Sequence, residues 1–278
     1  MIGQRNLTSR LGSLVRLKKL PRFIVLVGEL GSGRRTVTQW VAQEMGARFI
    51  EVNRAVEDIR NVVTQCYEVP DVTLYFIPDG DLMSAPAKSA LLKVTEEPPM
   101  NAYFVISTVD ADMLSPALVS RANVYHMDSY SMADISAFLN DPSADIQLYS
   151  NCCNNGREVN LVKQWGNDFF NFVTLVMDNI DVVSSSNAFK MENKIAFTDD
   201  AEGYDVKIFL QAFYAECMRR IRGMGNDMSK RPLRDQYIAW IQITSDKLKN
   251  MQIRAIDKRN VFDTWIFEIR EVSRSAEG

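Results

Sequence analysis

A glycine-rich segment, GELGSGRRT at residues 28–36, has most of the residues of a phosphate-binding loop. Such a loop joins a strand to a helix, so that its backbone N–H groups converge on phosphate oxygens at the helix N-terminus. Gly28, Gly31 and Gly33 have the spacing that this geometry needs, and Ser32 lies between the last two. The segment therefore predicts a place where a phosphate group can bind.

The cationic and hydroxyl positions of this loop depart from the usual pattern. A working loop has a Lys for the β- and γ-phosphates, followed directly by a Ser or Thr that holds Mg²⁺. Here Arg34 stands at the Lys position, Arg35 at the hydroxyl position, and Thr36 one residue late. Because a planar guanidinium does not simply replace a compact ammonium, three interpretations stay open. They are a tight turn without a ligand, binding of ATP or ADP without hydrolysis, and an active site of unorthodox composition.

The elements that position this loop follow from hydrophobic periodicity. Short apolar runs predict buried parallel strands, and apolar residues at helical spacing predict helices between them. Such alternation is typical of an α/β domain with helices on both faces of a parallel sheet. The predicted strands cover 23–28, 48–52, 72–77, 102–107 and 125–127, and the predicted helices cover 7–15, 36–45 and 85–97.

After residue 127 the pattern changes to helices alone. The stretches 184–194 and 197–203 are rich in polar residues and have little periodicity, which predicts loops or linkers. The fold class is therefore α/β followed by an all-helical half. The predicted helices cover 131–140, 144–154, 157–166, 168–183, 205–224, 231–250 and 254–274.

Composition narrows the class of protein. The 278 residues are 46% hydrophobic and 24% charged, and they contain neither a membrane-spanning apolar run nor a signal peptide, so we expect a cytoplasmic globular protein. The four cysteines lack CxxC spacing, which argues against a zinc module, and we expect no metal site. The net charge of −3 argues against a chain that grips nucleic acid with its whole surface. Residues 1–28, however, have six basic residues and no acidic one, which indicates either a solvated helix face or a phosphate-facing patch.

Two further segments together resemble one protein family. They are KSALLKVTEEPP at 88–99 and LSPALVSRA at 114–122. The pair resembles the AAA+ subunits of the replicative clamp loader of DNA polymerase III, and the delta-prime-like subunit most of all. The resemblance implies a five-stranded AAA+ domain at 1–127, a small helical lid at 128–167 and a helical oligomerisation domain, the collar, at 168–278.

The resemblance also implies where a second part of the nucleotide site should lie. Relatives have a Mg²⁺-binding Asp and a catalytic Glu directly after the strand that corresponds to 72–77. Counting back from the ALLK segment without gaps puts Pro78 at the Asp position and Asp79 at the Glu position. A shift by one residue makes Asp79 the metal ligand but puts Gly80 at the base position. Either alignment removes one of the two functions, so Asp79 is at most a remnant.

Three more candidate residues come from the same resemblance. Ser120 and Arg121 match a motif whose Arg, in relatives, reaches across a subunit interface to the γ-phosphate held by a neighbour. Arg121 is therefore the candidate for an arginine finger in trans, the alternative being a surface Arg before a strand. Thr108 corresponds to a sensor that orients the attacking water, and Arg157 is a possible sensor in the lid.

These features together imply a subunit that does not hydrolyse ATP itself but supplies Arg121 to a neighbouring ATPase subunit. We expect no required cofactor, with ATP or ADP binding possible without hydrolysis. The implied partners are ATP-hydrolysing motor subunits, a delta-like subunit, the sliding clamp and primer–template DNA, with no membrane. Two alternatives remain: an active AAA+ ATPase with an unorthodox site, and a repurposed AAA+ scaffold that binds replication proteins.

Overall fold

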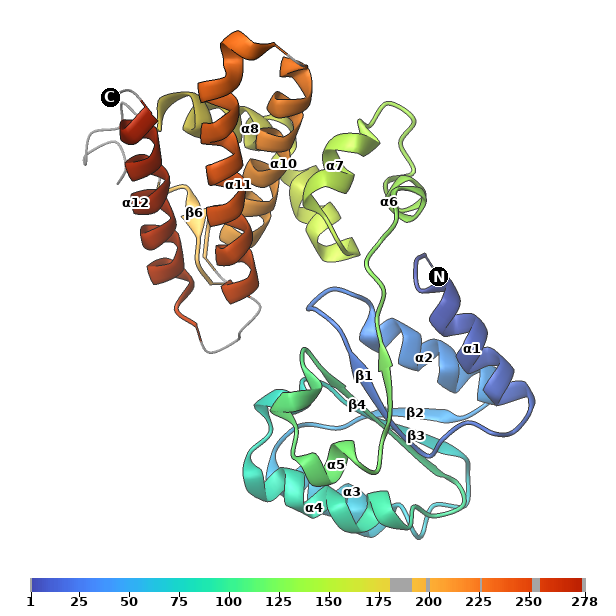
Figure 1. Ribbon diagram of the computed structural model, residues 1–278. Coiled ribbons are helices and arrows are strands. Elements are labelled where there is room, and N and C mark those ends of the chain that lie inside the picture. The colour runs from blue at the N-terminus through green and yellow to red at the C-terminus, as the bar shows by residue number, and fades with distance from the viewer. Residues whose placement is uncertain (1, 181–191, 199–200, 226, 252–255, 277–278) are drawn as a thin grey trace. The chain divides into compact units, whose positions relative to one another are not determined.

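The computed structural model describes residues 2–180, 192–198, 201–225, 227–251 and 256–276 (Figure 1). The chain divides into two compact units, which are described one at a time. The first comprises Met1–Asp141 and Asn154–Arg157, and the second comprises Pro142–Cys153 and Glu158–Gly278. The finer division into three domains that end at residues 127, 167 and 278 stays a proposal.

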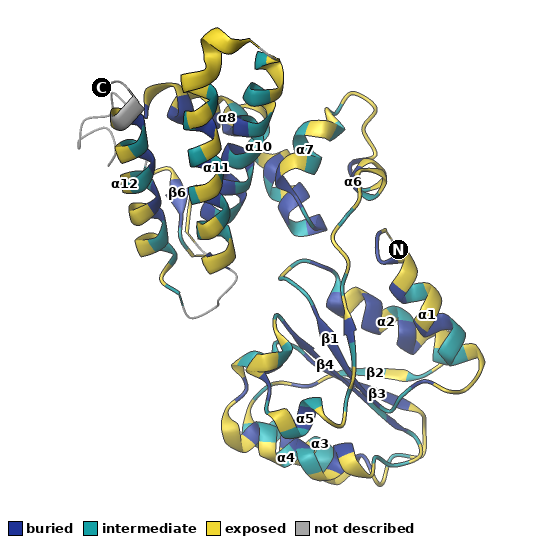
Figure 2. Cartoon of the chain, in the orientation of Figure 1, coloured by how far each residue is buried: buried dark blue, intermediate teal, exposed yellow. Residues whose placement is uncertain are grey.

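The first unit is built on the predicted five-stranded parallel sheet, with strand order β2-β3-β4-β1-β5. The strands are β1 (Phe23–Val27), β2 (Arg48–Glu51), β3 (Thr73–Ile77), β4 (Ala102–Thr108) and β5 (Asn123–His126). All residues of β1 and β3 are buried, as expected for strands that are covered on both faces (Figure 2). The last strand begins and ends earlier than the predicted range 125–127.

Helices cover both faces of this sheet (Figure 1). On one face, α1 (Arg5–Arg16) and α2 (Arg34–Met45) pack against alternate strand residues such as Ile24 and Leu26. On the other face, α3 (Val56–Gln65), α4 (Ala85–Glu96) and α5 (Pro116–Val119) pack against Val25 and its neighbours. The sequence analysis missed α3 and α5. The unit also contains α6 (Met132–Leu139).

The second unit is mainly helical, as predicted. Its buried aromatic residues include Phe213, Trp240 and Trp265, and the Trp265 indole N–H donates to the Thr244 hydroxyl at 2.9 Å. The predicted helices 157–166 and 168–183 correspond to one element, Gly156–Asn179, that is kinked at Gly166, while residues 181–183 lie outside the described residues. The helices are α7 (Ile146–Cys152), α8 (Gly156–Asn179, from Glu158 on in this unit), α10 (Val206–Met224), α11 (Arg231–Met251) and α12 (Lys258–Ala276).

One prediction about this half was wrong, because strands do return after residue 127. The two-residue strands β6 (Ile195–Ala196) and β7 (Tyr204–Asp205) pair in parallel, at either end of the predicted loop 197–203. Most of the predicted loop 184–194 lies outside the described residues. Among the helices that the structure describes, none is both long and apolar enough to cross a membrane.

The turn between β1 and α2 depends on two glycines in the left-handed backbone region. Gly31 has φ 86° and Gly33, the N-cap of α2, has φ 91°. A Cβ atom built on Gly31 would overlap the side chain of Arg157, whereas one built on Gly33 would meet no atom within 4 Å. The positive φ angle favours glycine at both positions, but only at Gly31 would a side chain also clash with its surroundings.

This difference gives a test of how closely the segment around Arg157 covers the loop. We expect Gly33→Ala to lower the free energy of unfolding by about 1–2 kcal/mol, the cost of a left-handed alanine. We expect Gly31→Ala to cost at least about 1 kcal/mol more, because the new methyl group must displace Arg157. Urea denaturation followed by circular dichroism measures both. Equal losses for the two variants would contradict this packing.

Candidate functional site

The phosphate loop, Asp79 and Thr108 meet at one edge of the sheet. Because all five strands are parallel, the segments that follow them emerge at the same edge, here called the carboxyl edge. The Gly28 N–H donates to the Thr108 carbonyl oxygen at 3.0 Å. The Asp79 N–H donates to the Ser107 hydroxyl at 3.2 Å. Segments from three strands thus form one site, although up to 80 residues separate Gly28 from Thr108 in the sequence.

An ion pair joins the glycine-rich loop to the segment that follows β3. Arg34, at the Lys position of the loop, has its Nη2 atom 3.2 Å from Oδ1 of Asp79. The Arg34 side chain is only 7% exposed and that of Asp79 is 25% exposed, so solvent screens this pair weakly. Asp79 has a left-handed backbone, with φ 48°, directly before the short 3₁₀ helix η1 (Gly80–Leu82). The cation that would face a phosphate therefore already has an anionic partner from its own chain.

The next two residues of the loop face away from this pair. Arg35 forms an exposed ion pair with Glu51, at the end of β2, with 2.7 Å between Nη2 and Oε2. Thr36 is exposed. Arg35, at the position where a Mg²⁺-binding hydroxyl was expected, therefore points to the surface, and so does Thr36.

Ser32 is only 6% exposed. Its hydroxyl group is buried and has no hydrogen-bond partner among the described residues. Its carbonyl oxygen lies 3.5 Å from the side-chain nitrogen of Gln4. The same Gln4 amide group donates to the Asp128 carbonyl at 2.6 Å and accepts from the Asp128 N–H at 2.8 Å. Gln4 therefore ties the N-terminal segment to the loop and to the chain after β5, a role that no local sequence pattern indicates.

The hydroxyl group of Thr108 is fully buried within its own turn. Its Oγ1 atom lies 2.7 Å from the Asp110 carbonyl oxygen and 3.3 Å from Oδ1 of Asp81. The Asp110 N–H donates to the same oxygen at 3.3 Å. Thr108 is thus placed at the carboxyl edge, as a sensor would be, and Asp81 is a neighbour that the sequence analysis did not single out.

Arg157 lies beside the phosphate loop, because its side chain fills the space next to Gly31. Asn155, which is 2% exposed, approaches Gly31 from the same segment. The Tyr130 N–H donates to the Asn154 carbonyl at 2.8 Å and fixes this segment to the chain after β5. The structure therefore brings the possible lid residue Arg157 to the loop.

Arg121 lies at the opposite edge of the sheet, because it precedes β5 instead of following a strand. It forms an ion pair with Glu96, and its Nη1 atom donates to the Ala117 carbonyl at 2.6 Å. Glu96 belongs to the first of the two sequence signatures and Arg121 to the second, so this contact joins them. Because β1 is five residues long, roughly 16 Å of strand at about 3.3 Å per residue separates the two edges. Within one chain, Arg121 and Arg34 do not belong to one site.

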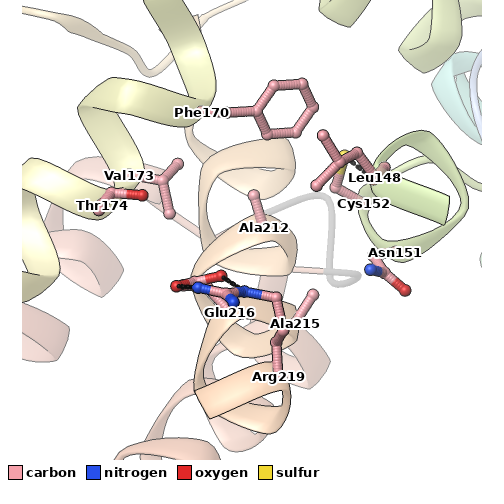
Figure 3. Close-up of a pocket in the computed structure, with 10 residues that line it drawn as sticks. All are labelled: Leu148, Asn151, Cys152, Phe170, Val173, Thr174, Ala212, Ala215, Glu216 and Arg219. Atoms are coloured by element: carbon pink, nitrogen blue, oxygen red, sulfur yellow. Dashed lines mark hydrogen bonds and ion pairs between the residues drawn. The ribbon is translucent and has the colours of Figure 1, made fainter. Parts of the chain in front are cut away.

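A cavity of about 240 Å³ lies in the second unit (Figure 3). Figure 3 shows an apolar floor that includes Val173 and Ala212, with the ion pair of Glu216 and Arg219 at its side. None of the site residues predicted from the sequence lines this cavity.

Comparison with known proteins agrees with the sequence signatures. Residues 38–131 match a family model described as "DNA polymerase III, delta subunit". The gamma subunit of DNA polymerase III from Buchnera aphidicola (subspecies Schizaphis graminum) is 25% identical over an alignment 170 residues long, and the match covers 50% of this chain and 47% of that protein. The tau subunit from Escherichia coli K12 is 22% identical over an alignment 166 residues long, and the match covers 49% of this chain and 26% of that protein. The chain thus spans about half the length of the gamma subunit and about a quarter of the length of the tau subunit.

Solved structures show the same fold. A gamma subunit-related protein of DNA polymerase III from Thermotoga maritima has a TM-score of 0.50 and 16% identity, over 95% of this chain and 99% of that one. The RuvB Holliday junction branch migration motor from the same organism has a TM-score of 0.51 and 14% identity, over 82% and 84%. By its sequence match over residues 38–131 and by its fold, this chain is similar to the delta/gamma/tau-like AAA+ subunits of the DNA polymerase III clamp loader.

Proposed function

We propose that this chain is a delta-prime-like subunit of a sliding-clamp loader that does not hydrolyse ATP and supplies an arginine finger to a neighbouring ATPase subunit. The observation that carries the first half of this proposal is the ion pair of Arg34 with Asp79. The position of Arg121 at the opposite edge of the sheet supports the second half.

The ion pair weakens each function that a nucleotide site would need. Phosphate binding at Arg34 would bring phosphate oxygens close to the negative charge of Asp79, which already neutralises this guanidinium. Metal binding or base catalysis by Asp79 would in turn leave the guanidinium of Arg34 without its partner. The backbone of the loop and the buried Ser32 hydroxyl still suit an anion. We therefore propose that ATP or ADP binds weakly or not at all, and without hydrolysis.

The surroundings of Arg121 suit a residue that acts on another subunit. Its side chain is 32% exposed, so part of the guanidinium is open to a neighbour. Ala117 and Glu96 engage two of its nitrogens, which holds the side chain in one orientation, while a guanidinium has five N–H donors in total. Donors thus remain for a phosphate, and a preoriented cation loses little entropy when it binds one.

The remaining parts of the proposal concern partners. The neighbours would be motor subunits with intact phosphate loops and a delta-like subunit, and the complex would act on a sliding clamp and primer–template DNA. The second, mainly helical unit would supply the contacts that hold the subunits together. These assignments rest on the similarity of this chain to the clamp-loader subunits.

The state of the nucleotide site can be tested on the chain alone. We expect its ATP turnover to be no faster than that of Arg34→Ala, because neither protein has a complete site. We expect Asp79→Asn to bind ADP at least about tenfold more tightly than the wild type, or about 1.4 kcal/mol, since the substitution removes the competing carboxylate. Isothermal titration calorimetry measures the affinity.

Asp112→Asn is the matched control for this experiment, because Asp112 is an exposed residue of the turn after β4 and the substitution removes the same charge. Equal ADP affinities for Asp79→Asn and Asp112→Asn would show that Asp79 does not block the site. Saturable ATP turnover by the wild-type chain, lost in Arg34→Ala, would favour the active ATPase.

The arginine finger can be tested in the assembled complex. We expect Arg121→Ala to join the ring normally, while hydrolysis at the site that it serves falls by about three orders of magnitude, a typical effect of losing such a residue. Steady-state ATPase assays of the purified ring, with gel filtration to check assembly, measure both. Arg60→Ala removes an exposed guanidinium from α3 and serves as the control. Wild-type ATPase rates in the Arg121→Ala ring would rule out the trans role.

A further inference from the structure

We propose that α1 and the turn after it form a docking surface for the phosphate backbone of a nucleic acid. This surface, the α1 basic face, is defined by five exposed cations: Arg5, Arg10, Arg16, Lys18 and Lys19. The proposal does not depend on the arginine finger or on ring assembly, because it concerns a property of the single chain.

The solvent side of α1 has a uniform chemical character. Its exposed helical positions are three arginines together with Asn6 and Ser9, and no acidic residue occurs in the first 28 positions. Leu17, Lys18 and Lys19 follow in the turn and are also exposed. Arginine guanidinium groups next to amide and hydroxyl groups are the side chains that bind phosphate oxygens in protein–DNA interfaces.

Most cations of this surface are not paired with a carboxylate of their own chain. Among the described residues, Arg10, Arg16, Lys18 and Lys19 form no ion pair with a carboxylate, whereas Arg5 interacts electrostatically with Asp134. Elsewhere, some exposed cations, such as Arg60 and Lys93, likewise form no ion pair among the described residues, whereas others have partners from their own chain. Examples are the ion pairs of Arg35 with Glu51, Lys230 with Asp227, Arg231 with Asp235 and Lys249 with Asp246.

The helix that carries these residues is held rigidly. Its apolar side, including Leu7 and Leu11, is buried against the sheet and α2. Gly12 lies directly against the Trp40 ring, where a Cβ atom would come within 3.1 Å of it. The Arg10 guanidinium lies over the Tyr125 ring, 5.0 Å from its centre. The cations therefore project from a fixed scaffold, which lowers the entropy cost of binding.

The same packing favours a nucleic acid over a lipid surface as the partner. A helix that lies in a membrane interface inserts its apolar side into the lipid, but the apolar side of α1 is already buried in the core. Leu17 is its only large exposed hydrophobic side chain. From Arg5 to Arg16 the helix is about 17 Å long at 1.5 Å per residue, which matches about five base-pair steps of a duplex.

The test uses the full-length chain and a fluorescently labelled 20-base-pair duplex of mixed sequence. We expect binding in the range of about 10⁻⁶–10⁻⁴ M at low salt, which weakens as salt is added. Arg16→Gln/Lys18→Gln/Lys19→Gln should weaken binding at least tenfold. It should also reduce the slope of log affinity against log salt by about 2–3, because three phosphate contacts are lost.

The control is Lys230→Gln/Arg231→Gln/Lys249→Gln, which changes the net charge equally at exposed cations that already have partners. We expect it to change the affinity less than threefold. Circular dichroism confirms that both variants fold. Equal losses in the two variants, or no duplex binding by the wild type, would overturn the proposal. Binding to phosphatidylserine vesicles in preference to the duplex would also overturn it.

Discussion

The parallel direction of the five strands is the constraint on which the functional layout depends. It gathers the loop after β1, Asp79 after β3 and Thr108 at the end of β4 at one edge. It also leaves the segments that precede strands, including Arg121, at the other edge. No side-chain rotation brings groups together across a buried sheet of this depth. Arg121 of one chain therefore does not reach the glycine-rich loop of the same chain.

The ion pair of Arg34 and Asp79 links two sequence changes that looked independent. A guanidinium that is 7% exposed needs an anion close by, since burial of an unpaired charge costs several kcal/mol. Asp79 follows β3 closely in the chain, and its left-handed backbone carries the carboxylate to within 3.2 Å of Arg34. Once the two are paired, each is held by the other. A later substitution of either residue alone would leave the charge of the other without a partner.

The spacing of apolar residues along the sequence predicted the helices and strands that are long enough to have a regular apolar pattern. The apolar runs located all five strands, and the spacing of Val56, Ile59, Val62 and Val63 would have located α3 as well. The four-residue α5 and the two-residue strands β6 and β7 are too short to have a period. The contacts of Gln4 with Asp128, Arg34 with Asp79 and Arg121 with Glu96 join residues 25–124 positions apart. Their partners are set by the fold, so no spacing rule reveals them.

Because the two edges are separate, the loss of one function need not weaken the other. The residues that hold Arg121, namely Glu96 and Ala117, lie on α4 and α5, on the face of the sheet opposite α1 and α2. Nothing in their packing requires a nucleotide at Arg34. An internal carboxylate at that site would even keep the carboxyl edge in one conformation when no nucleotide is present. A subunit of this kind would present its arginine steadily, while its neighbours change state with the nucleotides that they bind.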